Sequence, residues 1–282
     1  MEVAEYDTMA RLEDGYWWYL GLRRLVQRAL ELELGHTNSP RVLDAGCGTG
    51  GGIIAASRFF QDSLVVGADV APQAIDHCQR RGIGPLVRGS VHHLPFKNET
   101  FDVVLAIDLI STEGVCEDPA LQEASRVLGP GGVLVINVPA FKWLRGGHDR
   151  VACIRHRYRR SEVERLLVGH GFTVQRIQYW NALVLPAVFV VRRFLNPDRK
   201  GMSARSDLDS PPRWLNRMLI PLLQFDAWIC RVFRIPFGTS VFGVAHRDTD
   251  TVKHGTELSD LNVLVESSHK AWEQPVGTVS IS

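Results

Sequence analysis

The sequence predicts an α/β fold, in which parallel strands form a sheet and helical crossovers cover its faces. Short apolar runs of strand length alternate with longer segments of helical periodicity from residue 41 to residue 180. The run that ends at Ile107 is continuously apolar, as expected for a strand that is buried on both faces of a sheet. The first run ends in a glycine-rich turn, residues 46–51, that opens onto a helix. This order of strand, tight turn and helix is typical of nucleotide-binding sheets.

Composition and charge restrict the class of protein. The chain has 282 residues, enough for one large domain or one domain with an insertion. Its formal net charge of +1 argues against bulk binding to nucleic acid. The five cysteines are scattered without a C-x-x-C pair, so we expect free thiols in a reducing cytoplasm and no metal site. The N-terminus lacks the apolar core of a signal peptide, and no run reaches the ~20 apolar residues of a membrane-spanning helix.

The N-terminal segment predicts a helical leader. Residues 6–34 have helical periodicity, with Leu20, Leu25 and Leu30 on one side. The aromatic cluster 16–19 has two interpretations. It either packs the helix onto the core or forms a lid over a bound cation, because an aromatic face attracts positive charge.

Seven strands are expected along the rest of the chain. Asp69 follows the second strand, at the position where nucleotide-binding α/β folds hold ribose hydroxyls. The helix at 71–81 has Pro72 in its first turn. The helix at 119–128 is ended by the turn 129–132. The expected strands are 41–45, 64–68, 85–88, 101–107, 133–138, 172–180 and 239–246.

The basic segment 141–160 differs in kind from its neighbours. It mixes arginines with histidine, aspartate and tyrosine just after the fifth strand, at the sheet edge where ligands bind in open α/β folds. A solvated charged face and a site for a polar or anionic substrate are both open interpretations. After it, Ser161 with Glu164 predicts a capping box at the start of a helix that Gly171 ends.

Residues 181–236 form an apolar insertion before the last strand. Its second half has helical spacing from Trp214 to Phe225. Packing against the domain, a lid over an apolar substrate and docking at a membrane surface are three open interpretations. We expect residues 196–212 to form a mobile loop and the polar tail from 249 to 282 to be disordered.

The glycine turn admits more than one interpretation. Gly46, Gly48 and Gly51 satisfy the G-x-G-x-x-G dinucleotide fingerprint, and a turn without any ligand is the plain alternative. The fuller run Asp44-x-Gly46-x-Gly48-x-Gly50 resembles motif I of the class I S-adenosylmethionine-dependent methyltransferases. Two further segments are similar to that family, namely Leu94-Pro95-Phe96 and Arg126-Val127-Leu128-x-Pro130-Gly131-Gly132.

The resemblance implies a fold and a domain plan. The fold is a doubly wound, seven-stranded, Rossmann-like sheet whose last strand runs antiparallel between the fifth and sixth. The plan is a helical leader and cofactor lid at 1–38, a methyltransferase domain at 39–248 with the insertion 181–236, and a tail at 249–282. The group is the broad bacterial, type 11-like set of small-molecule enzymes, some of which act in secondary metabolism.

The resemblance also implies a cofactor, S-adenosylmethionine, and the residues that hold it. The expected cofactor residues are Asp44, Gly46, Gly48, Gly50, Asp69, Val70, Ser90, Val91, Ile107 and Trp17.

The reaction is methyl transfer to an O, N or C nucleophile of a small molecule, which we expect to be apolar with a polar or anionic group. For an O or N acceptor, His148 and His156 are the candidate bases and Asp149 an orienting acid. A histidine that merely packs the loop is the alternative. The substrate residues are expected from a similar pattern in bacterial relatives and are Arg157, Tyr158, Tyr179 and Asn181.

Two other functions compete with methyl transfer. An NAD-dependent oxidoreductase is compatible with the same glycines. A protein that binds S-adenosylmethionine without methylating is compatible with Ser90, which stands where the family has an acid, and with the lack of a histidine near Thr112. Equilibrium binding of the two cofactors distinguishes the first alternative, and release of S-adenosylhomocysteine distinguishes the second.

Overall fold

The structure is a computed structural model that describes residues 3–35, 39–60, 63–195 and 212–249. Residues 1–247 form one compact unit, so the leader, the sheet and the insertion share one core. The expected loop at 196–212 and the tail from 249 lie almost wholly outside the described residues, and both stay predictions.

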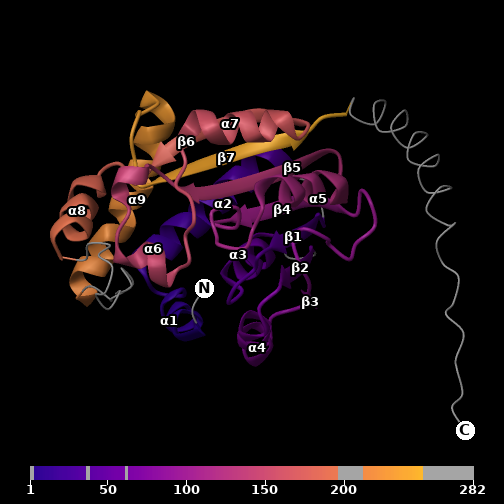
Figure 1. Ribbon diagram of the computed structural model, residues 1–282, viewed down its shortest axis with the longest axis horizontal. Coiled ribbons are helices and arrows are strands. Elements are labelled where there is room, and N and C mark those ends of the chain that lie inside the picture. Colours follow the sequence, from indigo (N-terminus) through magenta and orange to yellow (C-terminus); the bar gives the residue numbers. More distant parts are fainter. Residues whose placement is uncertain (1–2, 36–38, 61–62, 196–211, 250–282) are drawn as a thin grey trace, which may run out of the picture. The chain divides into compact units, whose positions relative to one another are not determined.

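The sheet has seven strands in the order β3-β2-β1-β4-β5-β7-β6 (Figure 1). β7 pairs antiparallel with β5 on one side and with β6 on the other, while the pairs among β1 to β5 are parallel. The expected doubly wound sheet with an antiparallel last strand is therefore confirmed. The strands are β1 Arg41–Ala45, β2 Leu64–Asp69, β3 Leu86–Arg88, β4 Phe101–Ile107, β5 Leu128–Pro139, β6 Phe172–Trp180 and β7 Ser240–Arg247.

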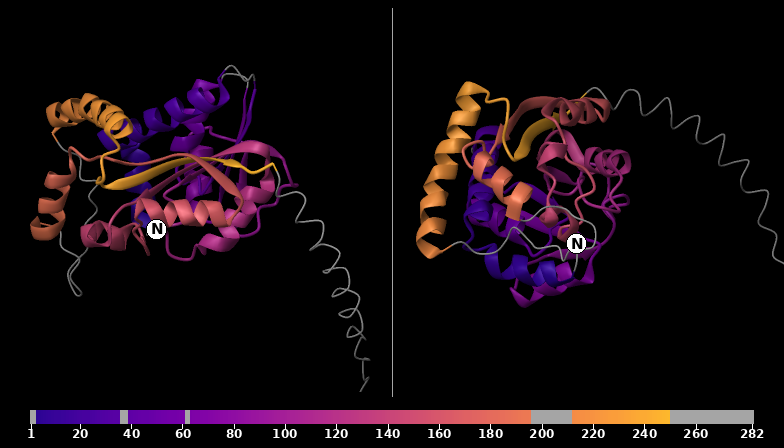
Figure 2. Two further views of the ribbon diagram at one scale, coloured as in Figure 1. Left: turned by 90° about the horizontal axis from the view of Figure 1, so that it is seen from above. Right: turned by 60° about the vertical axis from the view of Figure 1, so that its left-hand side comes forward.

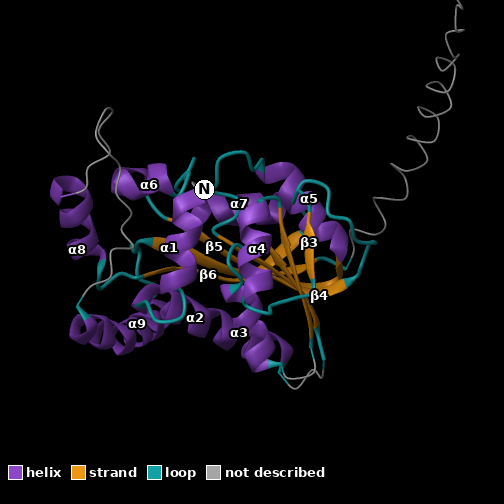
Figure 3. Cartoon of the chain, turned by 90° about the horizontal axis from the view of Figure 1, so that it is seen from below, coloured by secondary structure: helices purple, strands orange, loops and turns teal. Residues whose placement is uncertain are grey.

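Helices cover both faces of the sheet because each face presents an unbroken apolar layer. One layer packs against α2, α3 and α9, which follow one another along one side in Figure 3. The other layer packs against α5 and α7. The helices are α1 Val3–Leu12, α2 Trp17–Leu34, α3 Gly51–Phe59, α4 Pro72–Arg80, α5 Glu117–Val127, α6 Gly147–Val151, α7 Arg160–Gly169, α8 Leu185–Val190 and α9 Arg213–Phe233, with a 3₁₀ turn at Lys142–Leu144 and a π-helical turn at Val191–Leu195.

Three local expectations were wrong. Residues 129–132 do not form a turn between helix and strand, because α5 ends at Val127 and β5 begins at Leu128. The leader is not one helix, because α1 ends at Leu12 and α2 begins at Trp17, with Gly15 in the turn between them. The helix after the basic segment begins at Arg160 rather than after Ser161. There the Glu162 carboxylate accepts the Arg159 N–H at 2.6 Å, so the expected Ser161–Glu164 capping box does not form.

The insertion packs on the domain through one face of α9. A Cβ added at Gly21 of α2 would lie 2.5 Å from Leu223 Cδ1, so the Leu223 side chain of α9 packs directly over this glycine. The buried Asp226 carboxylate accepts the Asn181 and Leu183 N–H groups at 2.6 and 2.7 Å. Asn216 accepts the Trp17 N–H and donates to the Gly15 carbonyl. These contacts fix α9 against the turn between α1 and α2.

Candidate active site

A cavity of about 820 Å³ lies where β1, β2 and β4 end. It is lined from the sheet by residues just after these strands, from the leader by α1 and α2, and from the insertion by α8 and α9. In a doubly wound sheet this edge, beside the switch of strand order between β1 and β4, is where ligands bind. The leader and the insertion, which are far apart in sequence, both border this edge (Figure 1).

The glycine turn forms one wall of the cavity. Gly46 and Gly48 line it with φ values of +75° and +54°, which side chains other than glycine rarely adopt. A Cβ added at Gly48 would lie 2.8 Å from Met9 Cε of α1, so the leader closes over this turn. Gly50 is different, because it caps α3 at φ +94° and its Cβ would meet Ile83 Cδ1 at 2.7 Å. Gly50 shapes the turn and is not among the residues that line the cavity.

Two buried carboxylates stand at the tips of β1 and β2. Asp69 accepts the Gly48 N–H at 3.0 Å and the Ala71 N–H at 2.9 Å, and these bonds fix its side chain at the cavity wall. Burial, and after it the nearby charge of Asp69, raise the pKa of Asp44 to about 7. The Ile53 N–H at the start of α3 opposes this shift in part.

The raised pKa of Asp44 gives a pH dependence of stability. The folded chain holds the Asp44 proton up to about pH 7, whereas the unfolded chain releases it near its ordinary value of about 4. Stability from this group is therefore expected to fall as pH rises from about 4 to 7. Asp44→Asn removes the titration, so its melting temperature should vary less over that window than the melting temperature of the wild type. An equal slope in both proteins, measured by scanning calorimetry, would contradict the assignment.

Arg23 brings positive charge to the same wall of the cavity. Its side chain is largely buried, lies 3.7 Å from Glu13 and 3.1 Å from Asp14, and lines the cavity. Glu13 also pairs with Arg81 of the turn after α4. Thr49 lies beside them with a fully buried hydroxyl that has no hydrogen-bond partner in the described part of the chain.

A third acid, Asp108, follows β4 and is half-buried. Its φ is +55°, and its carboxylate accepts the Asn137 side-chain N–H at 2.9 Å. Asn137 in turn accepts the Trp180 indole N–H at 2.8 Å. Burial raises the pKa of Asp108 to about 7, although the hydrogen bond from Asn137 and the charge of Arg157 both act to lower it. A cavity carboxyl that titrates near neutral pH is a candidate base.

The segment after β5 brings His148 and Arg157 to the cavity. His148 lines it, and its Nδ1 is 3.9 Å from the buried Glu5 carboxylate of α1. Arg157 lines it too, and its Nε and Nη2 donate to the two Asp149 oxygens at 2.6 and 3.0 Å. Asp149 is fully buried and is not among the residues that line the cavity. The structure therefore pairs Asp149 with Arg157 instead of with His148.

The second candidate base, His156, and the remaining expected substrate residues, Tyr158, Tyr179 and Asn181, do not line the cavity. His156 is 3.6 Å from Glu162 and packs edge-on against Tyr158. Tyr179 accepts the Arg160 N–H at 3.1 Å, and the side-chain amide of Asn181 is buried with no hydrogen-bond partner in the described residues. Their roles stay predictions, and none of these four is among the residues that line the cavity.

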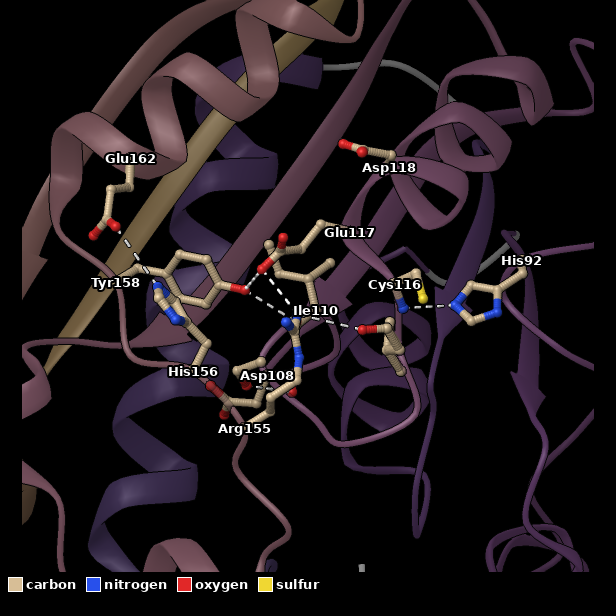
Figure 4. Close-up of polar contacts among 12 residues, drawn as sticks. His92, Asp108, Ile110, Cys116, Glu117, Asp118, Arg155, His156, Tyr158 and Glu162 are labelled. Carbon is tan, nitrogen blue, oxygen red and sulfur yellow. Dashed lines mark hydrogen bonds and ion pairs between the residues drawn. The ribbon is translucent and has the colours of Figure 1, made fainter.

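Tyr158 joins two loops that border the cavity. Its hydroxyl lies against the Glu117 carboxylate and 3.0 Å from the Ile110 carbonyl (Figure 4). Arg155 donates to the same carboxylate at 2.9 Å, and its own N–H donates to the Ser111 carbonyl at 2.7 Å. The segment after β5 is thus held against the loop after β4, whose residues line the cavity.

The predicted cofactor residues other than Gly50 all line the cavity, which brings together Trp17 of α2 and Ser90 and Val91 of the loop after β3. Sequence reasoning missed Glu5, Arg23 and Asp108. Asp108 carried a signal, because it directly follows the fourth apolar run, as Asp44 and Asp69 stand at the ends of the first two. Glu5 carried none, since only the fold of α1 brings it to His148.

The cavity continues into an apolar part between the leader and the insertion. Its walls there are aliphatic side chains of α2, α8 and α9 and of their flanking turns. They include Leu22, Val184, Val188, Val191, Leu215 and Leu219. The polar part and the apolar part together can hold a nucleoside-sized molecule beside a second, apolar one.

Comparison with known proteins finds a similar family for the segment that runs from β1 into β5. Residues 43–136 match the family described as "Methyltransferase domain". The phthiotriol/phenolphthiotriol dimycocerosates methyltransferase of Mycobacterium leprae is 40% identical over 98 residues, which are 33% of this chain and 36% of that protein. The fatty-acid O-methyltransferase of Mycolicibacterium smegmatis is 40% identical over 95 residues, 33% of this chain and 34% of that protein. The chain thus matches about a third of the length of these relatives.

The fold extends beyond the matched segment. The geranyl diphosphate C-methyltransferase of Streptomyces coelicolor A3(2) superposes with a TM-score of 0.52 over 79% of this chain and 80% of that one. At 18% sequence identity this likeness shows the shared fold.

Proposed function

We propose that the chain transfers a methyl group from S-adenosylmethionine to an apolar small molecule with a polar group, because residues 43–136 match the family described as "Methyltransferase domain". The observation that carries the proposal is one cavity in which the motif I turn, the acids Asp44, Asp69 and Asp108 and an aliphatic compartment meet. The names of the two curated relatives, which act on a fatty acid and on a dimycocerosate lipid, support the choice of an apolar acceptor.

The cavity residues fit the cofactor. Gly46 and Gly48 line the cavity at positions where a Cβ would crowd Leu109 and Met9, and the unpartnered Thr49 hydroxyl offers a polar contact beside them. Asp69 would hold ribose hydroxyls, and Arg23 would hold the carboxylate of the methionine part. Trp17 places an aromatic ring in the same wall, where it can face a cation. Bound S-adenosylmethionine would supply an electrophilic methyl group.

The protein would then contribute in two ways, by positioning the cofactor and the acceptor and by removing a proton from the acceptor. The cavity holds two molecules close together away from water, which is the main source of rate in such transfers. His148 would take the proton of an O or N acceptor, with Glu5 stabilising the imidazolium. Asp108 is the other base within the cavity. Arg157, kept charged by Asp149, would orient the polar end of the acceptor.

The function is tested by product release. Purified protein is incubated with S-adenosylmethionine and a panel of long-chain acids, phenols and amines, and S-adenosylhomocysteine is measured by mass spectrometry. We expect release with at least one amphipathic acceptor. Tight binding of NADH with no binding of S-adenosylmethionine would favour the oxidoreductase. Binding of S-adenosylmethionine without release on any acceptor would favour a protein that does not methylate.

The cofactor residues give a separate prediction. Asp69→Ala should weaken S-adenosylmethionine binding by about tenfold or more, because a charge-assisted hydrogen bond contributes ~1.5–3 kcal/mol. Gly48→Val should weaken it further, since its side chain would fill the cavity wall at a positive φ. Asp76→Ala, an exposed acid on α4, is the matched control and should bind normally. Unchanged affinity of Asp69→Ala by calorimetry would remove Asp69 from the cofactor site.

A further inference from the structure

The outer surface of the insertion is apolar to an unusual degree. In the described chain, most of the large hydrophobic side chains that are exposed lie between Leu183 and Phe237. Soluble monomers rarely expose a contiguous apolar patch of this kind unless it binds something. We call this surface the α8–α9 face, and its exposed members are Leu183, Phe189, Val190, Val191, Phe194, Trp214, Met218, Leu222, Phe225, Trp228, Val232, Phe233 and Phe237.

On α9 the exposed apolar residues form a stripe distinct from the side that packs on the domain. Leu223, Asp226 and Cys230 are buried and recur at helical spacing on the inner side. Trp214, Met218, Phe225 and Val232 recur at the same period on the outer side, and each is at least half exposed. The helix is therefore apolar on two sides, and only the inner side has a partner within the described residues.

The charges on the α8–α9 face have one sign. Arg193, Arg213, Arg217 and Arg234 are exposed, and the single acid between residues 183 and 195 or 212 and 237, Asp226, is fully buried. Helices that lie in the interface of an anionic bilayer have this composition: they carry tryptophan and phenylalanine beside arginine and lack exposed acids. A protein partner with a core-like interface would not require this uniform positive charge.

The cavity reaches the same surface. Val191 lines the cavity and is also 39% exposed, and Leu215 and Leu219 line it from α9. α8 and α9 stand at the same end of the sheet in all views (Figures 1 and 2). No helix in the described ranges is long and apolar enough to span a membrane. An apolar acceptor held in a bilayer would thus meet the aliphatic part of the cavity at the protein surface.

We propose that the α8–α9 face docks on the surface of an anionic lipid bilayer. The arginines give the long-range attraction, and the tryptophan and phenylalanine side chains enter the boundary between headgroups and acyl chains. Docking rests on the surface alone and does not require the methyl-transfer activity to be present.

The test is flotation of the purified chain with vesicles of phosphatidylcholine alone or of phosphatidylcholine mixed with phosphatidylglycerol. We expect the chain to float with the anionic vesicles, less so with the neutral ones, and less so as salt is raised. The double variant Arg213→Gln with Arg217→Gln should lower partitioning onto anionic vesicles by about tenfold, because each arginine near an anionic surface contributes measurably to binding. Trp214→Ser with Phe225→Ser should lower it on both kinds of vesicle.

Matched controls lie elsewhere on the surface. Arg58→Gln on α3 removes an exposed arginine, and Val168→Ser on α7 removes an exposed apolar side chain, and both should float like the wild type. Because the changed side chains are exposed, the variants should fold like the wild type, and the melting temperature of each variant checks this. Absence of flotation, or flotation unaffected by the face variants, would overturn the proposal. Concentration-dependent dimers that the same variants abolish, without vesicle binding, would show that a second copy covers the face.

Discussion

Asp149→Ala is expected to lower the free energy of unfolding by about 3–5 kcal/mol, because it leaves the charge of Arg157 buried without its partner. Asp149 is fully buried and Arg157 nearly so, and two hydrogen bonds of 2.6 and 3.0 Å join them. The Gly146 N–H also donates to Asp149 at 2.9 Å, so the same substitution loosens the start of α6. Urea unfolding followed by circular dichroism measures the loss.

A double variant separates the charge from the packing. Asp149→Leu combined with Arg157→Met replaces the pair by apolar side chains of similar size, and should cost less than Asp149→Ala alone. A single substitution that costs under ~1 kcal/mol would mean that water reaches Arg157 and that the pair is not effectively buried.

The pH dependence of this pair has the opposite sign to that of Asp44. Burial alone would raise the pKa of Asp149, but the charge and hydrogen bonds of Arg157, the charge of Arg192 and the Gly146 N–H hold it below its usual range. Its stabilisation is therefore present above the unfolded value of about 4 and is lost as pH falls through the lower folded value. Asp149→Ala should accordingly lose more stability at neutral pH than in acid.

The fold could be predicted because its signals are local. Each strand is a short apolar run with its own stop, and the bounds expected for β1, β4 and β6 agree with the structure. The break between α1 and α2 was missed because the periodicity of residues 6–34 continues across Gly15. Backbone hydrogen bonds within the turn and its contact with Asn216 of α9 fix the break. The start of α7 was predicted two residues too late. Ser161 and Glu164 have the spacing of a capping box, but the helix already begins at Arg160, where Glu162 accepts the Arg159 N–H.

Only the part of the site that lies at the ends of the strands could be predicted from the sequence. Asp44, Asp69 and the glycines follow strands, so their neighbourhood follows from the parallel sheet. The acceptor side is built from segments far apart in sequence, and Glu5, His148 and Val188 meet only after folding. Adjacent residues in sequence then take different roles, as His148 lines the cavity while Asp149 is buried behind it.

The choice between bases depends on His148, and His148→Ala should lower turnover of an O or N acceptor by about 10²-fold or more. The imidazole is the side chain that exchanges protons near neutral pH, and Glu5 at 3.9 Å would stabilise its charged form. Affinity for S-adenosylmethionine should stay within about a factor of two, because the expected cofactor contacts come from other elements. The measurement is the initial rate of S-adenosylhomocysteine release over a range of pH, with the acceptor found by the product-release screen.

His156→Ala is the matched control for this prediction, because His156 lies in the same segment and is not among the residues that line the cavity. It should retain turnover and the shape of the pH profile, while Glu5→Gln should shift the profile of the wild type toward lower pH. If His148→Ala keeps both rate and profile, His148 only packs the loop. The base would then be Asp108, whose pKa is raised to about 7, and Asp108→Asn should abolish the pH dependence. A reaction at carbon would leave the rate insensitive to the substitutions at His148, Glu5 and Asp108, since a carbon nucleophile needs less help from a base.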